Sequence, residues 1–265
     1  MQEYLNQGIK GVINQFPAVE NILNDYNIGC APCSIGSCLL KDIIDIHNLS
    51  PGDEEILMGR IAGVIYPGQE VEIPMTERKA VAGARQKGYS PPMKKLVDEH
   101  VLIKRLVALI PGIIDNLDVE SAAGRGVISD SVDFIRSYAD KYHHAKEEDI
   151  LLKYADENMD IIKTIYQDHE NGRGHVRAIL KGLADRDAPA VGEHLKAYQE
   201  LLTEHIKKED EILYPWMDRK LSITRIGELF SEFNRKDEEF GDTPVKYEAL
   251  INRLEPEYKL KEEVK

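Results

Sequence analysis

The chain has 265 residues, enough for one large domain or for a domain with a smaller module, and it can bury a core without disulfide bonds. Its formal net charge of −13 argues against a strongly basic surface, so we expect neither a nucleic acid nor an anionic membrane as a partner. No apolar run approaches the roughly 18 residues of a membrane span and the first residues lack the features of a signal peptide, so we expect a cytoplasmic protein.

Apolar residues recur at helical spacing through most of the chain, and strand-like alternation is nearly absent. The sequence therefore predicts an all-α fold. Residues 1–66 are predicted to form a small helical module, with one helix beginning near Pro17 and two further short helices over 38–47 and from Pro51. Residues 67–90 are rich in proline and glycine with little apolar periodicity, which is typical of a linker.

Four long amphipathic segments follow the predicted linker, with breaks near residues 116–127, 157–160 and 186–189. This pattern is typical of an up-down-up-down four-helix bundle, which we expect over residues 91–219. Residues 220–265 are predicted to form a C-terminal helical extension. The expected architecture is thus a helical bundle with a small cysteine-containing module before it and a helical extension after it.

Histidines of the predicted bundle occupy positions that helical spacing assigns to the buried seam. His100, His169 and His205 each replace an apolar residue in the core stripe of the first, third and fourth helices. In the second helix the stripe runs into His143 and Glu147, which are four residues apart and share one face of an α-helix. The matched positions of these residues along their helices predict that they meet at one level of the bundle.

The position of each nearby acidic residue on its helix indicates whether it shares the buried face with these histidines. Glu209 follows His205 by four residues and stays on the core stripe, so we favour it over the neighbouring Asp210, although the choice between the two remains open. In the second helix, the face of His144 and Glu148 carries charged and hydroxyl side chains. We therefore expect His144 and Glu148 to point away from the core.

Four imidazoles and two carboxylates are thus expected at one level of the bundle. A single histidine on an apolar face is usually a core residue satisfied by hydrogen bonds, but two buried carboxylates would be costly without a shared cation. A metal site is therefore the favoured interpretation. Six mixed nitrogen and oxygen donors suit two divalent ions bridged by carboxylates better than one tetrahedral zinc ion, although donor type alone does not identify the metal.

At this point the residues resemble the hemerythrin-type HHE cation-binding family. The resemblance rests on the seam histidines and on the stretches HAKEEDIL, DHENGRGH and EHIKKEDEILYP, and it covers about residues 91–217. It implies a non-haem di-iron centre, with two iron ions bridged by carboxylates and an oxo group. The terminal ligands implied by the resemblance are His100, His143, His169 and His205, and the implied bridges are Glu147 and Glu209.

One position departs from the pattern of the oxygen-carrying hemerythrins. These proteins have a fifth histidine one turn after that of the third helix, where this chain has Arg173. The remaining set of four histidines and two carboxylates resembles the di-iron proteins that repair iron–sulfur clusters after nitrosative or oxidative stress. The resemblance implies a protein that binds or reacts with NO or O₂ in cluster repair or NO detoxification. The alternative is a protein that stores or senses O₂, NO or iron without catalytic turnover.

The predicted N-terminal module carries the cysteines of the chain, Cys30, Cys33 and Cys38, an odd number that does not suit a secreted disulfide framework. The cluster-repair proteins are similar in having such a module, but their cysteines are adjacent. Three roles stay open for these thiols: a redox disulfide between Cys30 and Cys33, inert reduced thiols, or ligands of an iron–sulfur cluster. Iron–sulfur proteins would be the partners in repair. The sequence is compatible with a homodimer but does not decide the oligomeric state.

Overall fold

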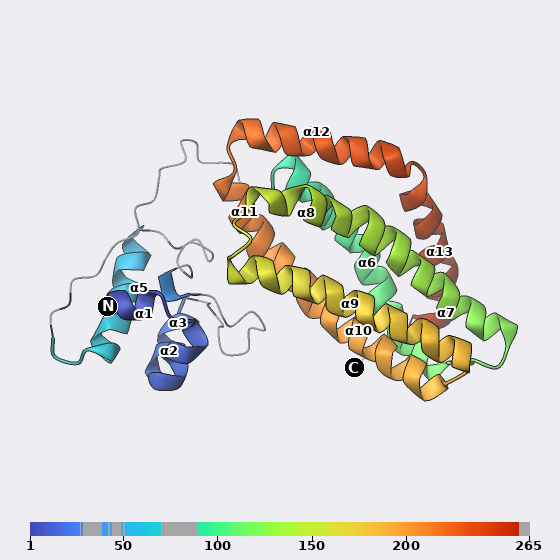
Figure 1. Ribbon diagram of the computed structural model, residues 1–265, viewed down its shortest axis with the longest axis horizontal. Coiled ribbons are helices and arrows are strands. Elements are labelled where there is room, and N and C mark those ends of the chain that lie inside the picture. Colours follow the sequence, from blue (N-terminus) through green and yellow to red (C-terminus); the bar gives the residue numbers. More distant parts are fainter. Residues whose placement is uncertain are drawn as a thin grey trace.

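The computed structural model describes residues 1–26, 28, 39–41, 43, 49, 51–69, 71 and 89–259. Within these ranges the chain is helical, and its only β pairing is an isolated bridge between Gly8 and Leu39, so the all-α prediction is confirmed (Figure 1). None of these helices combines the length and the hydropathy that a membrane span requires. Most of the predicted helix over 38–47, most of the predicted linker and all three cysteines lie outside the described residues.

Residues before the predicted linker form short helices that share a hydrophobic cluster of their own. Ile9, Leu23 and Ile61 belong to this cluster and are fully buried in it. Helix α5 opens at Pro51 as predicted, and Pro17 is the residue that precedes the first turn of α3. The helices described in this part are α1 (Gln2–Leu5), α2 (Ile9–Gln15), α3 (Ala18–Asn24) and α5 (Pro51–Ile65).

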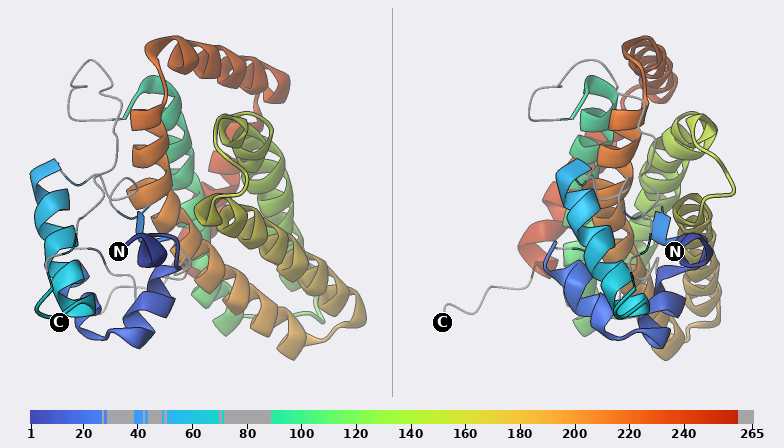
Figure 2. Two further views of the ribbon diagram at one scale, coloured as in Figure 1. Left: turned by 60° about the vertical axis from the view of Figure 1, so that its left-hand side comes forward. Right: turned by 90° about the vertical axis from the view of Figure 1, so that its left-hand side faces the viewer.

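The helices from Pro91 to Lys220 form four long helical segments, which we call the central segments. The second and fourth segments each change from α-helical to π-helical geometry along their length. Helices α9 and α10 lie side by side, as the views in Figures 1 and 2 show. The central segments are α6 (Pro91–Asp115), then α7 (Ala122–Phe134) with η1 (Ile135–His144), α8 (Ala145–Asp149) and η2 (Leu151–Tyr154), then α9 (Asp160–Asp185), and finally α10 (Ala188–Lys208) with η3 (Glu209–Leu213) and α11 (Tyr214–Lys220).

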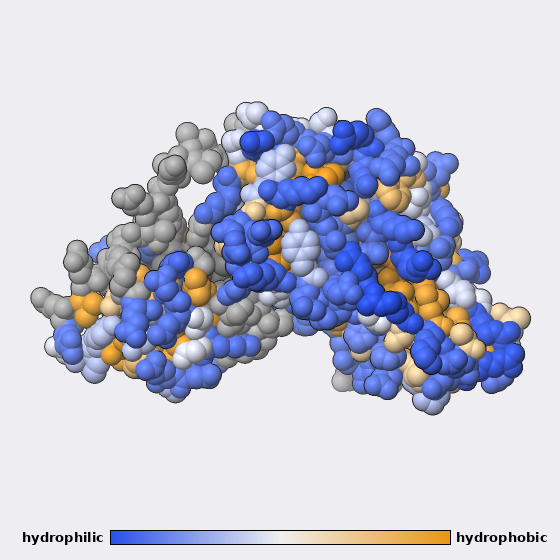
Figure 3. Space-filling model, viewed as in Figure 1, coloured by the Kyte–Doolittle hydropathy of each residue, from blue (hydrophilic) through white to orange (hydrophobic). Residues whose placement is uncertain are grey.

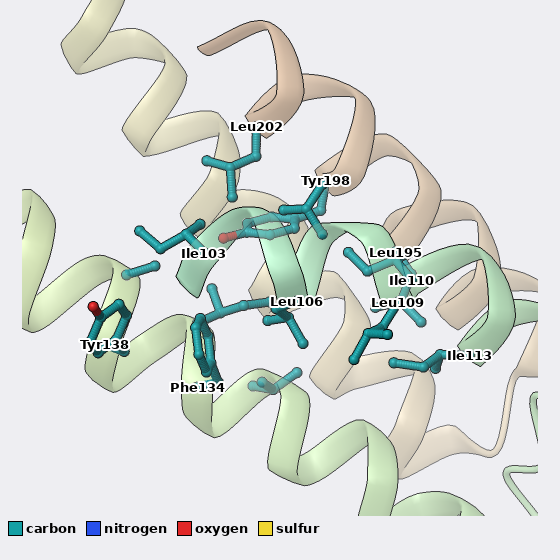
Figure 4. Close-up of a cluster of buried hydrophobic side chains, with 14 of the residues drawn as sticks. Ile103, Leu106, Leu109, Ile110, Ile113, Phe134, Tyr138, Leu195, Tyr198 and Leu202 are labelled. Atoms are coloured by element: carbon teal, nitrogen blue, oxygen red, sulfur yellow. The ribbon is translucent and has the colours of Figure 1, made fainter. Parts of the chain in front are cut away.

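Two hydrophobic clusters lie within the central segments, and they are separated along the helices. The larger cluster contains Leu106 of α6, Phe134 of α7 and Leu195 of α10 (Figure 4). Along α6, Leu96 belongs to the smaller cluster and Ile103 to the larger one, and His100 lies between them. The apolar clusters therefore enclose a layer of polar side chains from both ends.

Helices α12 (Ile223–Phe240) and α13 (Thr243–Tyr258) cover the central segments and pack on α6. Leu229 and Phe233 of α12 belong to the smaller cluster, whereas Tyr247 and Ile251 of α13 belong to the larger one. These helices are therefore part of the same cores as the central segments. Burial of their apolar faces holds them in place.

The packing of α13 on α6 requires a glycine at position 112. A Cβ atom there would lie 1.9 Å from the carbonyl oxygen of Tyr258, so the backbone of α13 would have to move. We expect Gly112→Ala to lower the free energy of unfolding by about 1–3 kcal/mol, measured by urea denaturation, because overpacking displaces the helix.

The matched control for this substitution is Gly227→Ala in α12, where no atom lies within 4 Å of the added Cβ. It should raise the free energy of unfolding by about 0.5–1 kcal/mol, because alanine has the higher helix propensity. Equal stability of the Gly112→Ala variant and the unmodified chain would contradict the close approach of α13 to α6.

Candidate metal centre

Seven buried polar side chains meet between the two hydrophobic clusters, and we call them the polar cluster. None of them is more than 7% exposed. They are supplied by all four central segments. The polar cluster consists of the six predicted site residues, His100, His143, Glu147, His169, His205 and Glu209, together with His144, which was not among them.

The donor atoms of the polar cluster form two groups, each compact enough to hold one ion. Within each group the donor atoms lie within 4.8 Å of one another. The first group contains His144, Glu147, His169 and His205, and the second contains His100, His143 and Glu209.

Each carboxylate of the polar cluster also reaches the group to which it does not belong. Glu147 Oε2 lies 3.4 Å from His169 Nε2 of its own group and 3.8 Å from His143 Nε2 of the other. Glu209 Oε2 lies 3.3 Å from His100 Nε2, and Glu209 Oε1 lies 3.1 Å from His205 Nε2. Both carboxylates thus lie between the two groups, which is the arrangement of bridging ligands in a two-metal centre.

Four of the histidines direct Nε2 into the polar cluster and pair Nδ1 with an outer carboxylate. Such a carboxylate accepts a hydrogen bond from Nδ1–H, orients the ring and leaves Nε2 available to a metal. The Nδ1–oxygen distances are 2.7 Å for His100 to Asp210, 2.9 Å for His143 to Glu99, 2.6 Å for His169 to Glu148 and 3.4 Å for His205 to Asp168.

Several polar atoms at the centre have no hydrogen-bond partner among the described residues. Those that face the space between the two groups are His143 Nε2, Glu147 Oε2 and both carboxylate oxygens of Glu209, and His144 Nδ1 also has none. Burying such atoms without a partner costs several kcal/mol, most of all for a carboxylate. Cations between the two groups would satisfy the carboxylate oxygens and His143 Nε2, so the residues present fit a metal centre.

The structure distinguishes the roles of Glu209 and Asp210. Glu209 is fully buried and contacts imidazoles of both groups. Asp210 lies outside the centre, where it accepts hydrogen bonds from the Nδ1 of His100 and from Lys104. The geometry thus favours Glu209 as the donor, as its position on the core stripe predicts, and gives Asp210 the role of orienting a histidine.

The expectation that His144 points away from the core is wrong. Its side chain is 7% exposed, and its ring stacks on that of His169 with centroids 3.8 Å apart. The reason is the π-helical geometry of η1, which has more residues per turn than the α-helix on which the prediction was based. The direction in which successive side chains point around the helix axis therefore changes along η1, and the adjacent residues His143 and His144 are both buried.

Glu148 also lies closer to the centre than expected, although it is not one of the donors. It accepts hydrogen bonds from His169 Nδ1 and from Arg173. Arg173 also donates to Asp140, whose carboxylate lies 3.6 Å from His144 Nδ1. The arginine at the position of the carriers' fifth histidine thus holds two carboxylates against two rings of the polar cluster. The two consecutive histidines of the second helix were the sequence feature that could have indicated that His144 belongs to the site.

Burial and hydrogen bonding set the protonation of the polar cluster. Burial lowers the pKa of His143 well below its usual value and that of His144 to about 3, so both rings are neutral. Burial alone would raise the pKa of Glu209, but the charge of His205 and the other imidazoles that face the carboxylate lower it well below its usual range. Although burial lowers it, a hydrogen bond to an outer carboxylate helps to raise the pKa of His100 to about 9, and the pKa of His205 is raised in the same direction. Because neutral imidazoles and ionised carboxylates are the forms that bind metal ions, bound cations would displace protons from these rings.

Three buried residues beside the polar cluster were missed by sequence reasoning. The Tyr214 hydroxyl donates a 2.6 Å hydrogen bond to Glu147, and its ring stacks on His100. Lys146 is fully buried and pairs with Glu99, the carboxylate that orients His143. Burial raises the pKa of Glu99 to about 7, against the opposing effect of Lys146. Tyr214 lies within the stretch EHIKKEDEILYP, whereas no spacing rule pointed to Glu99 or Lys146.

Comparison with known proteins agrees with this geometry. Residues 92–217 match the family model described as the hemerythrin HHE cation binding domain, and this range contains the whole polar cluster. An uncharacterized protein of Mycobacterium bovis is 25% identical over 171 residues, which cover 60% of this chain and 66% of the relative. Two uncharacterized proteins of Mycobacterium tuberculosis match to the same extent. The match therefore spans slightly less than two thirds of these relatives. No solved structure shows significant similarity to the chain.

Removing His144 tests whether this ring belongs to the centre. Because it lies in the first donor group, we expect His144→Ala to weaken metal binding by about tenfold or more, measured as metal per chain during chelator competition. His194→Ala is the matched control, since His194 pairs with His175 away from the polar cluster and its loss should leave the metal content unchanged. Equal metal retention by the two variants would exclude His144 from the centre.

Proposed function

Because residues 92–217 match the model of the hemerythrin HHE cation-binding family, we propose that the polar cluster binds two iron ions. The observation that carries the proposal is the position of Glu147 and Glu209, each buried between two groups of imidazoles. One group would hold the first ion through His144, His169 and His205, and the other would hold the second ion through His100 and His143. The two carboxylates would be shared.

We propose that this di-iron protein binds and reacts with NO or O₂. Bound iron supplies vacant coordination and accessible redox states for such diatomic molecules. The protein's own residues shape the site: apolar clusters cover it at both ends, and outer carboxylates hold the imidazole rings in place. Tyr214 holds a proton on its hydroxyl beside Glu147, where it orients the carboxylate.

The role that we favour is repair of stress-damaged iron–sulfur clusters or NO detoxification. The support is the resemblance to the cluster-repair proteins, together with a cysteine-containing N-terminal module as in those proteins. In this proposal Cys30, Cys33 and Cys38 handle thiol chemistry or the recipient cluster, and iron–sulfur proteins are the partners. A cytoplasmic location belongs to the proposal, because closely spaced thiols stay reduced there.

The second candidate is binding, storage or sensing of O₂, NO or iron without turnover, and a specific observation favours it. His144 raises the number of imidazoles at the site to five. The oxygen-carrying hemerythrins also have five, although they place the fifth on the third helix, where this chain has Arg173. A fifth imidazole from the second central segment would thus compensate for the missing one.

We also propose how the chain is divided into domains. Residues 91–219 would form the di-iron four-helix up-down-up-down bundle, and residues 1–66 would form a separate module joined to it by the linker at 67–90. The hydrophobic cluster confined to the first 66 residues supports a separate module. Residues 220–265 would be an extension of the bundle, since Phe233 and Tyr247 are buried with bundle residues.

The proposed centre predicts the metal content of the protein. Anaerobically purified chain should contain about two irons, with Mössbauer parameters of a coupled pair that change on exposure to O₂ or NO. Glu147→Ala should lose iron, because it removes a carboxylate that lies between the two donor groups. Glu170→Ala, which removes an exposed acid of the third central segment, should retain it. Zinc alone, or two irons in the Glu147→Ala variant, would contradict the proposal.

The cysteines distinguish the two candidate functions. In cluster repair, a Cys30→Ser, Cys33→Ser double variant should keep its iron but lose the ability to restore a damaged iron–sulfur enzyme. A storage or sensing protein would bind NO or O₂ with unchanged affinity in the same variant. Iron content and gas-binding spectra should be recorded on one preparation, with Cys38→Ser as the control for a general effect of thiol removal.

A further inference from the structure

A cavity of about 310 Å³ reaches the polar cluster from the side of η1, α9 and α10. Its volume lies at the lower end of the range for small-molecule binding pockets and exceeds what a diatomic gas requires. The imidazoles of His144, His169 and His205 line it. These are the histidines of the first donor group, and none of the second group contributes to the lining. The cavity therefore approaches one side of the centre only.

Apolar side chains form much of the cavity wall beyond the imidazoles. They come from all three elements that surround it: Ile135 of η1, Val176 and Leu180 of α9, and Tyr198, Leu201 and Leu202 of α10. Figure 3 shows hydrophobic surface between the α7–η1–α8 segment and α9, bordered by strongly hydrophilic side chains. An apolar chain or ring would be favoured in this space over water.

Guanidinium groups add a charge preference to the cavity. Arg173 pairs with Asp140 and Arg177 pairs with Glu170. Arg136 also lines the cavity and is exposed, and in the described part of the chain it has no carboxylate partner. The carboxylates that line the cavity pair with other cations, Asp140 with Arg173 and Asp168 with Lys208.

The spacing along the helices sets the length of a suitable molecule. Arg136 lies eight residues before His144, which corresponds to about 12 Å at the rise of an α-helix. Arg177 lies the same number of residues after His169, whose ring stacks on that of His144. A medium-chain carboxylate such as octanoate has a comparable extended length. Its head could pair with guanidinium at one end while its tail reached the imidazoles at the other.

From these observations we propose that the cavity binds an amphiphilic monocarboxylate, with its carboxylate at Arg136 and its apolar part directed towards the His144–His169–His205 side of the centre. This inference rests on the proposed function, since it assigns a substrate class to the iron centre. It distinguishes the two ions: the first donor group faces the organic molecule, and the second is enclosed by protein. No chemical step is needed for the binding itself to be tested.

The test is titration of the iron-loaded full chain with octanoate by isothermal titration calorimetry. Gly172 lines the cavity, and a Cβ there would make only ordinary contacts with Tyr198 and Leu201, so Gly172→Ala should bind octanoate normally. Gly172→Leu places a larger side chain in the space and should weaken binding at least tenfold. Leu201→Phe fills the cavity from α10 instead, and serves if Gly172→Leu does not fold.

A second set of binding measurements tests the charge preference of the cavity. Octanol and octylamine should bind at least tenfold more weakly than octanoate. Arg136→Gln should remove most of the difference between octanoate and octanol, whereas Arg225→Gln, on α12 and outside the cavity, should preserve it. Equal binding of octanoate and octanol, or no effect of Arg136→Gln, would overturn the assignment of a carboxylate head.

Iron content measured on the same samples separates this proposal from the proposed function. Failure of octanoate to bind to protein that holds two irons would overturn the cavity proposal alone. So would unchanged binding in both cavity-filling variants. If the chain bound octanoate but could not be loaded with iron, the di-iron function would fail while the cavity remained a carboxylate-binding site.

Discussion

The attraction between buried carboxylates and the cations they require is the constraint on which the rest of this structure depends. Glu147 and Glu209 are fully buried, and three of their four oxygens have no hydrogen-bond partner among the described residues. Buried carboxylate oxygens without a partner are costly, so the layer is complete only with positive charge at its centre. The hydrophobic clusters on either side lower the local dielectric constant and so strengthen the electrostatic interactions between them.

The outer shell of the site shows how the fold fixes ligand geometry. Four imidazoles each face an outer carboxylate at Nδ1, and several of these carboxylates are held in turn by a cation. Lys146 holds Glu99, Lys208 holds Asp168 and Lys104 holds Asp210. Such pairs fix the tautomer and the ring direction before any metal binds. The long helices supply the donors, and the charged shell determines how each donor points.

Much of the fold and of the site could be predicted because both follow from helical periodicity. The stripe that contains Leu96, His100 and Ile103 identifies a buried face, and a histidine on that face at a matched level in each helix indicates a shared site. The same reasoning favoured Glu209 over Asp210, in agreement with the geometry. It failed where the helix itself departs from α geometry, because a π-helical turn changes the facing of residues that the sequence spaces normally.

The sequence by itself determined the all-α fold, the six side chains predicted to meet and their likeness to HHE domains, since each depends on residue type and on a regular period. Only the tertiary structure decided that His144 joins them, that Tyr214 and Glu99 contact them, and that a cavity reaches one donor group. The physical reason is that these features depend on helix phase in η1 and on contacts between residues far apart in the chain. Local propensity does not encode either of them.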